Sequence, residues 1–276
     1  MTLTKSYALF CAMFLVAGSS HAHYPYVAPL NYQTFNNHSA IVSGFYDNPF
    51  VSEIAIKNFN FTVYTPEGKK LQLKEADWAK TQTLSSYSLE NKTDGTYRIR
   101  GEKLANKTSF AFDQNQWKTL IHADADPTKP APANVVYASQ LSKKTKVKTV
   151  QTVELIETFV SRRSSSSNVL KMDQPEFNIE FLSHPNAIQN GQLIQLKVLD
   201  KNKGIENVKV EILAQTTDYS RDGKVYKNLE TDQQGNLNFS LADKGQYLLK
   251  IDYQQPFSMK ADELKRFKYT LSFNVI

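Results

Sequence analysis

TVQTVELIETFV, residues 149–160, is the stretch that decides the fold, because it reads as one long β-strand. Successive side chains of a strand point to opposite faces. One group would lie on one face and a second group on the other: Val150, Thr152 and Glu154, and then Val153, Leu155 and Glu157. The same period of two recurs along the chain, whereas long helical periodicity is nearly absent. The sequence therefore predicts an all-β protein.

A polar segment follows this strand. Residues 161–168 read SRRSSSSN, a low-complexity composition that is typical of a linker or an exposed loop. Five strand patterns then follow at regular spacing. Their apolar positions are Ile194, Leu196 and Val198; Val208, Val210 and Ile212; Leu237, Phe239 and Leu241; Tyr247, Leu249 and Ile251; and Tyr269, Leu271, Phe273 and Val275. This strand count over about 100 residues predicts an immunoglobulin-like sandwich without its disulfide.

Shorter strand patterns precede the long strand. They lie at residues 59–63, 96–100, 110–112 and 117–122. One short helix is expected at residues 74–80, with Trp78 as its apolar contact. We therefore predict two β-sandwich domains. The expected bounds are 23–160 for the N-terminal sandwich, 161–176 for a linker or exposed loop, and 177–276 for the C-terminal immunoglobulin-like sandwich.

Residues 1–22 have the pattern of an export signal peptide. Lys5 supplies a positive charge, residues 7–17 form an apolar core, and residues 20–22 give a small-x-small cleavage site. The only cysteine, Cys11, lies in this segment, so the mature chain lacks disulfides, thiolate catalysis and cysteine-based zinc sites. No later apolar run approaches the roughly 18 residues that a membrane helix needs. We expect a periplasmic protein with no transmembrane segment after cleavage.

Charge and motifs exclude several function classes. The net charge of +6 is modest and spread along the chain, and the lysines at residues 143–148 surround a strand-like run, so no nucleic acid is expected as a partner. The sequence contains no Gly-x-Ser-x-Gly, no His-Glu-x-x-His and no phosphate-binding glycine loop. We therefore predict that the protein is not an enzyme.

Cleavage after Ala22 would make His23 the first residue of the mature chain. An α-amine titrates near about 7.7–8.0 and an imidazole near about 6.5, so both nitrogens lose protons to a metal easily around neutral pH. One more histidine would complete a three-nitrogen site that suits Cu²⁺, Ni²⁺, Co²⁺ or Zn²⁺. The alternative is that His23 is merely where the signal ends and binds nothing.

The mature start HYPYVAP, residues 23–29, resembles the His-x-Pro-aromatic opening of the NikM-like periplasmic proteins. That family contains a domain of unknown function and is often labelled the periplasmic component of cobalt or nickel transport. The resemblance continues in order through FTVYTPEG (61–68), DGTYR (94–98), ETFV (157–160), SHPN (183–186), NG (190–191), TDQQG (231–235) and YTLSF (269–273). It implies a periplasmic protein with an immunoglobulin-like C-terminal sandwich and a role with Ni²⁺ or Co²⁺.

The chain departs from this family at Asp47-Asn48-Pro49-Phe50. Many relatives carry Gly-His-Pro-Phe at these positions. If that histidine is a metal ligand in the relatives, Asn48 does not supply the same nitrogen.

Three further histidines are candidate ligands. His122 begins HADAD, residues 122–126, where a persisting strand would align the imidazole with two carboxylates; the alternative is an acidic loop. His184 precedes Pro185 at the start of the C-terminal sandwich, and it is either a ligand or a buried histidine bonded to a backbone carbonyl. His38 lies in a polar turn, is expected to be exposed, and ranks last.

The sequence thus predicts a non-enzymatic periplasmic protein that binds a divalent transition metal and assists its uptake. The expected ion is Ni²⁺ or Co²⁺, with Cu²⁺ or Zn²⁺ as alternatives, and an inner-membrane transporter would receive it. The expected ligands are His23 with His122 or His184. The alternative is a metal-free immunoglobulin-like adhesion or adaptor module whose tyrosine-rich surface binds a protein or glycan.

Overall fold

The computed structural model describes residues 24–123, 132–171, 176–215, 225–257 and 261–276. Within these ranges the regular structure consists of strands and two 3₁₀ turns, η1 (Glu75–Asp77) and η2 (Ala138–Gln140), so the predicted all-β class is confirmed. The prediction of a helix at residues 74–80 is wrong. η1 and the strand β7 (Ala79–Lys80) replace it, and Trp78 packs on Phe61 with ring centroids 4.4 Å apart. No helix among the described residues is long and apolar enough to cross a membrane.

The N-terminal part of the chain forms a β-sandwich. One sheet contains β1 (Tyr24–Pro29), β3 (His38–Tyr46), β8 (Ser85–Glu90) and β7, with β4 (Ile54–Ala55) beside β3. The other layer contains β6 (Lys70–Leu73), β5 (Asn60–Tyr64), β9 (Gly95–Asp113) and β12 (Val147–Arg162), and β2 (Gln33–Thr34) pairs with the end of β12. Apolar residues of both layers, including Val27, Ile41, Phe61 and Ile99, share one core.

The residues beyond 176 form the predicted immunoglobulin-like sandwich. One sheet contains β13 (Asn178–Phe181), β14 (Ile194–Asp200), β18 (Asn236–Phe239) and the short β15 (Lys203–Gly204). The other contains β17 (Val225–Glu230), β16 (Lys209–Ala214), β19 (Gly245–Pro256) and β20 (Glu263–Val275). These sheets correspond to the A-B-E and C′-C-F-G sheets of an immunoglobulin fold. Tyr247, near the start of β19, donates to the Asp243 carbonyl over 2.8 Å, which is the tyrosine corner of that fold.

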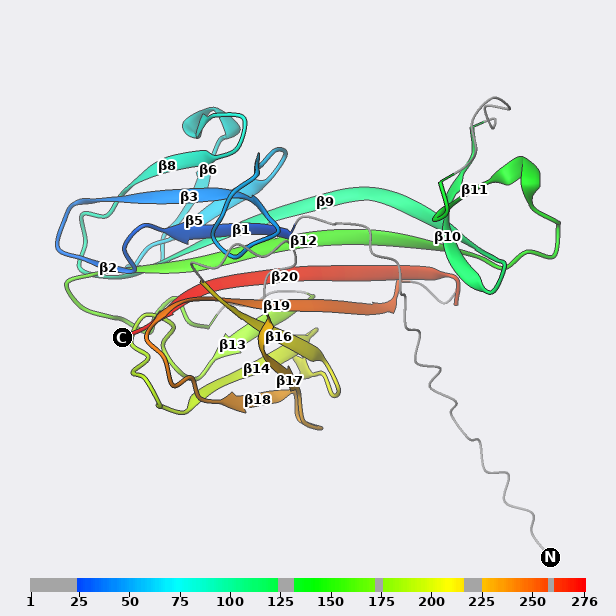
Figure 1. Cartoon of the computed structure of the whole chain (residues 1–276). Coiled ribbons are helices and arrows are strands. Elements are labelled where there is room, and N and C mark those ends of the chain that lie inside the picture. Colours follow the sequence, from blue (N-terminus) through cyan, green and yellow to red (C-terminus); the bar gives the residue numbers. More distant parts are fainter. Residues whose placement is uncertain (1–23, 124–131, 172–175, 216–224, 258–260) are drawn as a thin grey trace, which may run out of the picture. The chain divides into compact units, whose positions relative to one another are not determined.

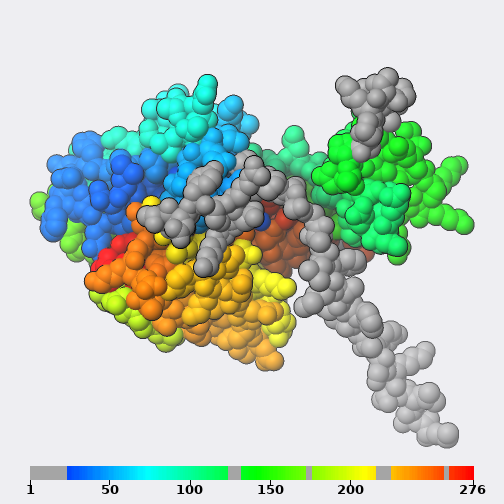
Figure 2. All heavy atoms as spheres, viewed as in Figure 1, coloured from blue at the N-terminus to red at the C-terminus, as the bar shows by residue number. Residues whose placement is uncertain are grey.

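The long strand predicted at residues 149–160 is β12, and it contributes to both cores. It pairs in parallel with β20, so the sheet of the C-terminal sandwich continues through β12 into β9 (Figure 1). Leu155 and Phe159 face the C-terminal core, whereas Ile156 and Val160 face the N-terminal core. Figure 2 shows the blue N-terminal residues packed directly against the orange C-terminal residues. Because both faces of β12 are buried, apolar residues occur next to one another in this strand, as in Leu155-Ile156 and Phe159-Val160.

Two compact units make up the chain, and their bounds differ from those of the predicted domains. Where the chain is described, the larger unit lies within residues 21–107 and 149–276, and the smaller lies within residues 108–148. In the smaller unit the end of β9 pairs with β10 (Gln116–Ile121), which pairs with β11 (Val135–Tyr137). The segment expected as a linker begins inside β12, and its residues Val169 and Leu170 are buried in the C-terminal core.

Candidate functional site

The predicted ligand His23 and the expected signal peptide lie outside the described residues, which begin at Tyr24. β1 starts at Tyr24 and pairs antiparallel with β3, so that Tyr24 lies opposite Tyr46. His23 is bonded to Tyr24, and the Cα atoms of adjacent residues are about 3.8 Å apart. Tyr24, the residue that follows His23 in the sequence, therefore lies at the end of β3.

Tyr24 is anchored at this end of the sheet. Its ring centroid lies 4.2 Å from Lys250 Nζ and 5.0 Å from Lys268 Nζ. Burial, together with the charge of Asp252, raises the pKa of Tyr24 to about 12, so the phenol stays neutral. Cations over an aromatic ring are attracted by its negative face. The contacts of Tyr24 with Lys250 and Lys268 thus hold the start of β1 against β19 and β20.

Acidic side chains offset the positive charge around the start of β1. Arg266 Nε donates to Asp252 Oδ1 over 2.7 Å, and Lys250 forms an ion pair with Glu211. Burial, and then the charge of Arg266, lower the pKa of Lys268. Two of the three cations named at the start of β1, Arg266 and Lys250, are therefore paired with carboxylates, and Lys268 is the third.

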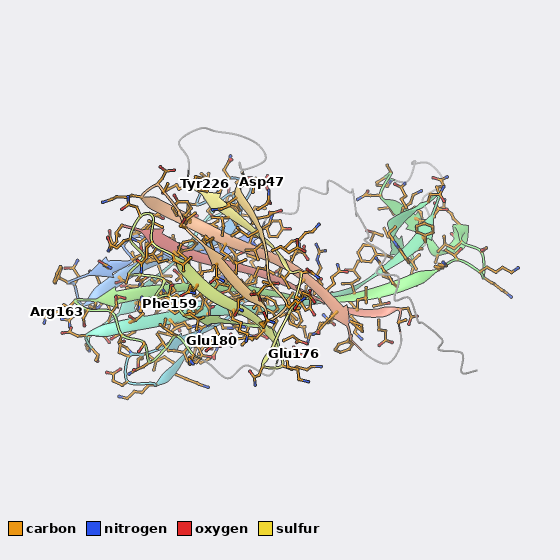
Figure 3. The ribbon with its side chains drawn as sticks, turned by 90° about the horizontal axis from the view of Figure 1, so that it is seen from below. Asp47, Phe159, Arg163, Glu176, Glu180 and Tyr226 are labelled. Atoms are coloured by element: carbon orange, nitrogen blue, oxygen red, sulfur yellow. The ribbon has the colours of Figure 1, made fainter. Side chains whose placement is uncertain are left out.

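The turn at residues 47–50, which we call the amino-end turn, follows β3 directly beside the start of β1 (Asp47 in Figure 3). Asn48 is only 4% exposed, and its Oδ1 has no hydrogen-bond partner among the described residues. Phe50 has a φ of 66°, which bulky residues rarely adopt. Tyr26 contacts Phe50 in two ways. The two ring centroids lie 5.9 Å apart, and the Tyr26 hydroxyl donates to the Phe50 carbonyl over 3.3 Å. Backbone strain of this kind is concentrated at functional sites.

A second polar region lies on the face of β9 and β12 that meets the C-terminal core. We call it the polar row, and it comprises Thr96, Arg98, Arg100, Glu157 and Ser161. The buried Glu157 accepts Arg98 Nε over 2.6 Å and the hydroxyl of Tyr269 over 2.6 Å. Burial alone would raise the pKa of Glu157, but the charges of Arg98 and Arg100 overcome this effect and hold it below its usual range.

The polar row is structural. The side chains of Arg98 and Glu157 are 0% exposed, so no ligand from solvent reaches their ion pair. Arg98 Nη2 and Arg100 Nε also lack hydrogen-bond partners within the described part of the chain. An unpartnered buried atom is therefore not by itself a sign of a binding site. What distinguishes Asn48 is its position in the turn beside the start of β1 and the strained Phe50 two residues later.

His184 contacts the polar row through Thr96. Its Nδ1 accepts the backbone N–H of Asn186 over 3.1 Å. Its Nε2 lies 3.2 Å from the Ser166 carbonyl and 2.9 Å from Thr96 Oγ1, which in turn contacts Ser161 Oγ. Both ring nitrogens of this half-buried residue are thus engaged by the fold, and one of them lies within hydrogen-bond distance of a backbone carbonyl, as in the alternative interpretation. Burial lowers the pKa of His184.

His184 is also remote from the amino end. Tyr24 contacts Lys268, which pairs with Glu154 in β12. His184 contacts Thr96, which contacts Ser161. Ser161 lies seven residues further along β12 than Glu154, or about 23 Å at the rise of a β-strand. A single ion cannot bind both ends.

The other two predicted ligands are His38, in the larger unit, and His122, in the smaller unit. His38 is exposed, as expected, and begins β3, eight residues or about 27 Å from Tyr46. His122 follows β10 in the smaller unit and is exposed, because the strand ends before it. Asp124 and Asp126, which were expected to align with His122, lie outside the described residues. Across the described ranges no three His, Cys, Asp or Glu residues form a group that could hold a metal ion.

The comparisons with known proteins identify a family but no activity. Residues 20–255 match a family described as "Domain of unknown function (DUF4198)". No curated protein matches the sequence.

Some solved structures are weakly similar. A marsupial T cell receptor is 8% identical, with 92% of this chain and 72% of that chain covered and a TM-score of 0.22. A mutant Salmonella alpha-2-macroglobulin is 8% identical, with 94% and 15% covered and a TM-score of 0.20. The Bacillus anthracis TIE protein is 10% identical, with 92% and 59% covered and a TM-score of 0.20. TM-scores this low do not establish a common fold.

Proposed function

This chain belongs to the DUF4198 family of unknown function, and we propose that it is an exported, non-enzymatic protein that binds a divalent transition metal at its amino end. One observation carries the proposal. β1 begins one residue after His23, and its partner strand leads directly into the amino-end turn, where the buried Asn48 Oδ1 has no partner among the described residues. The resemblance to NikM-like proteins supports Ni²⁺ or Co²⁺ as the ion.

The donor set fits such an ion. The amine and imidazole of His23 supply two nitrogens, and Asp47 and Asn48 supply a carboxylate and an amide oxygen. Mixed nitrogen and oxygen donors suit Ni²⁺ and Co²⁺, and also Cu²⁺ or Zn²⁺. This set differs from the predicted one, because Asp47 and Asn48 take the place of His122 or His184.

The chemistry of the amino end agrees with capture and release. The two nitrogens of His23 must be deprotonated to bind, so affinity rises with pH through their titration range. Only one histidine contributes, and the oxygen donors bind these ions less strongly than imidazole. Moderate affinity would let an inner-membrane transporter take the ion from the protein. Export by the signal at residues 1–22 would place this exchange in the periplasm.

The adhesion or adaptor alternative has less support. It rests on a tyrosine-rich surface, yet six tyrosines are buried: Tyr26, Tyr32, Tyr46, Tyr97, Tyr247 and Tyr269. These residues build the two cores and the tyrosine corner. The immunoglobulin-like fold alone does not specify a partner.

Calorimetry on the exported protein tests the proposal, after mass spectrometry has established that its first residue is His23. We expect saturable binding of Ni²⁺ or Co²⁺ with a Kd below the micromolar range. His23→Ala should weaken it by at least about 100-fold, since even the loss of an outer-sphere partner costs about 10–100-fold. His38→Ala is the matched control and should bind like the wild type. Absent saturable binding of any of the four ions, or equal binding by His23→Ala, would refute the proposal.

A further inference from the structure

A second site lies where β12 ends and β2 pairs with it. Residues 33–35, 161 and 163–165 line a cavity of about 90 Å³ there. One water molecule needs about 10–15 Å³ of such space, so the cavity admits a group of several heavy atoms but not a drug-sized molecule. It is separate from the amino-end turn, as the positions of Arg163 and Asp47 in Figure 3 show.

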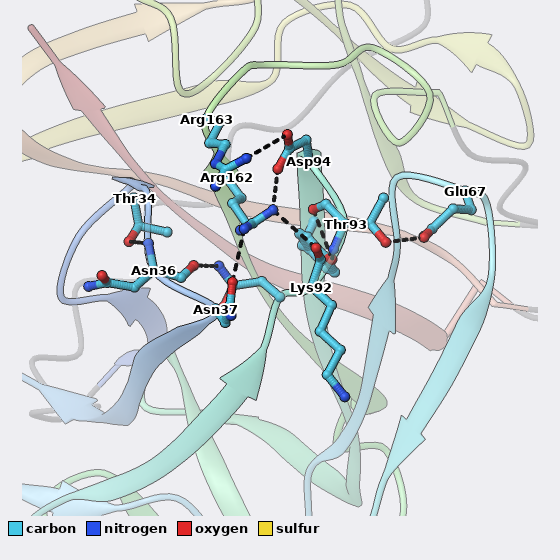
Figure 4. Close-up of polar contacts among 11 residues, drawn as sticks. Thr34, Asn36, Asn37, Glu67, Lys92, Thr93, Asp94, Arg162 and Arg163 are labelled. Carbon is cyan, nitrogen blue, oxygen red and sulfur yellow. Dashed lines mark hydrogen bonds and ion pairs between the residues drawn. The ribbon is translucent and has the colours of Figure 1, made fainter.

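The walls of this cavity are held firmly. β2 pairs in parallel with β12, and the Arg163 N–H donates to the Thr34 carbonyl over 2.9 Å. Arg162 fixes the neighbouring loops from the other side (Figure 4). Its guanidinium contacts Asp94, the Lys92 carbonyl and Asn37 Oδ1.

The cavity lining carries one charge, and that charge is positive. Arg163 is the only ionised residue among those that line it, and the others there are Gln33, Thr34, Phe35, Ser161, Ser164 and Ser165. Arg163 Nη1 lies 3.6 Å from Asp94 Oδ2, which is too long for a charge-assisted hydrogen bond of about 2.7–2.9 Å. Arg162 occupies the other carboxylate oxygen of Asp94. With a side chain that is 55% exposed, Arg163 can therefore turn to a second anion.

An exposed aromatic ring stands at the rim of the cavity. Phe35 is 80% exposed, the largest value among the exposed large apolar residues of the described chain. We propose that this cavity binds the carboxylate head of a small organic acid, with Arg163 as the ion-pairing group and Phe35 as the contact for the apolar part. The fork of an arginine matches the two oxygens of a carboxylate, and the serine hydroxyls can donate to them. The cavity is large enough for the head group, and the tail would cover the ring.

NMR titration of the isotope-labelled protein tests the proposal with four probes: hexanoate, acetate, 1-hexanol and inorganic phosphate. We expect hexanoate to shift the signals of residues 33–35 and 163–165 saturably and to bind more tightly than the other three. Arg163→Asn should weaken hexanoate binding at least about tenfold, because a hydrogen bond to a charged group is lost. Asn tolerates the φ of 57° at this position, so the turn is kept. Phe35→Ala should weaken binding about threefold or more.

Two matched variants separate this site from other effects. Lys244→Gln removes one exposed positive charge from another turn and should leave hexanoate binding unchanged. His23→Ala should also leave it unchanged, since the amino end is a different site. The proposal is overturned if hexanoate causes no saturable shift at the cavity, or if Arg163→Asn binds it as the wild type does. Phosphate binding tighter than hexanoate would overturn it too, in favour of an inorganic anion.

Discussion

The polar row and the amino-end turn each contain buried polar side chains, but those side chains have different partners. In the polar row, the carboxylate of Glu157 is bonded to groups of the same fold. So are both ring nitrogens of His184, which contacts Thr96 of this row. In the amino-end turn, Asn48 Oδ1 has no such partner among the described residues, and the Phe50 backbone is strained. A histidine in a suggestive motif is therefore not an available ligand until the partners of its nitrogens are known.

The two regions also have different roles in the fold: the polar row joins the two sandwiches, whereas the amino-end turn lies beside the start of β1. The polar row lies where β9, β12 and β20 share one sheet, so its ion pair ties strands of both sandwiches. The amino-end turn lies outside that sheet, after β3. Changes in the polar row should therefore alter stability and leave metal affinity unchanged. Changes in the amino-end turn should alter metal affinity and leave stability unchanged.

The largest expected effect is that of Glu157→Gln. The substitution leaves the buried Arg98 and Arg100 without a compensating charge, and breaking a buried ion pair costs about 3–5 kcal/mol. Urea unfolding followed by tryptophan fluorescence measures the loss. Glu90→Gln, which removes a carboxylate from an exposed pair with Lys92, is the control and should not move the unfolding midpoint measurably. A Glu157→Gln protein as stable as the wild type would show that the polar row does not hold the sheet.

Asn48→His should have the next largest effect, on metal affinity. It introduces the histidine that the resemblance to NikM-like proteins implies at this position, and it replaces an amide oxygen by a nitrogen donor that Ni²⁺ and Co²⁺ prefer. We expect the Kd to fall about 10–100-fold, the scale on which ligand surroundings alter metal affinity. Calorimetry on this variant and on Asn48→His combined with His23→Ala checks it. An unchanged Kd in Asn48→His would place the turn outside the metal site.

His184→Ala should lower stability by about 1–3 kcal/mol, because the Ser166 carbonyl and the Asn186 N–H lose a buried partner. Metal affinity should not change. Parallel urea unfolding and calorimetry distinguish the two roles. A loss of metal affinity of tenfold or more would restore His184 as a ligand and contradict the structural role of the polar row.

The fold was predictable in outline, because its signals are local. The alternation at residues 149–160 gave the central strand β12, and the regular turns gave the strands of the C-terminal sandwich. The parallel pairing of β12 with β20 was not predictable, since it joins residues more than a hundred positions apart. The burial of Val169 and Leu170 after a serine-rich segment depends on the same long-range packing.

The candidate site was less predictable. The sequence pointed to His23 and showed Asn48 as a departure from the NikM-like pattern that the chain resembles. It could not show that Tyr24 lies opposite Tyr46, directly before the amino-end turn, because the register of β1 against β3 is set by packing. Nothing in the sequence signalled the positive φ of Phe50, since neither glycine nor asparagine occupies that position. The partners of His184 come from Ser166 and Thr96, distant in the chain, so its engaged nitrogens were equally hidden.

The smallest expected effect is a difference in pH dependence that His184 causes. Burial lowers the pKa of its imidazole, so near this pKa the folded protein binds fewer protons than the unfolded chain. The stability that the neutral ring contributes is therefore complete above about pH 6.5, the usual imidazole value, and is lost as the pH falls through the folded-state pKa. Protonation of Nδ1 would remove its bond from the Asn186 N–H. Urea unfolding between about pH 7.5 and 5.5 should show a steeper loss for the wild type than for His184→Gln, and equal slopes would mean that the ring is not held neutral by the polar row.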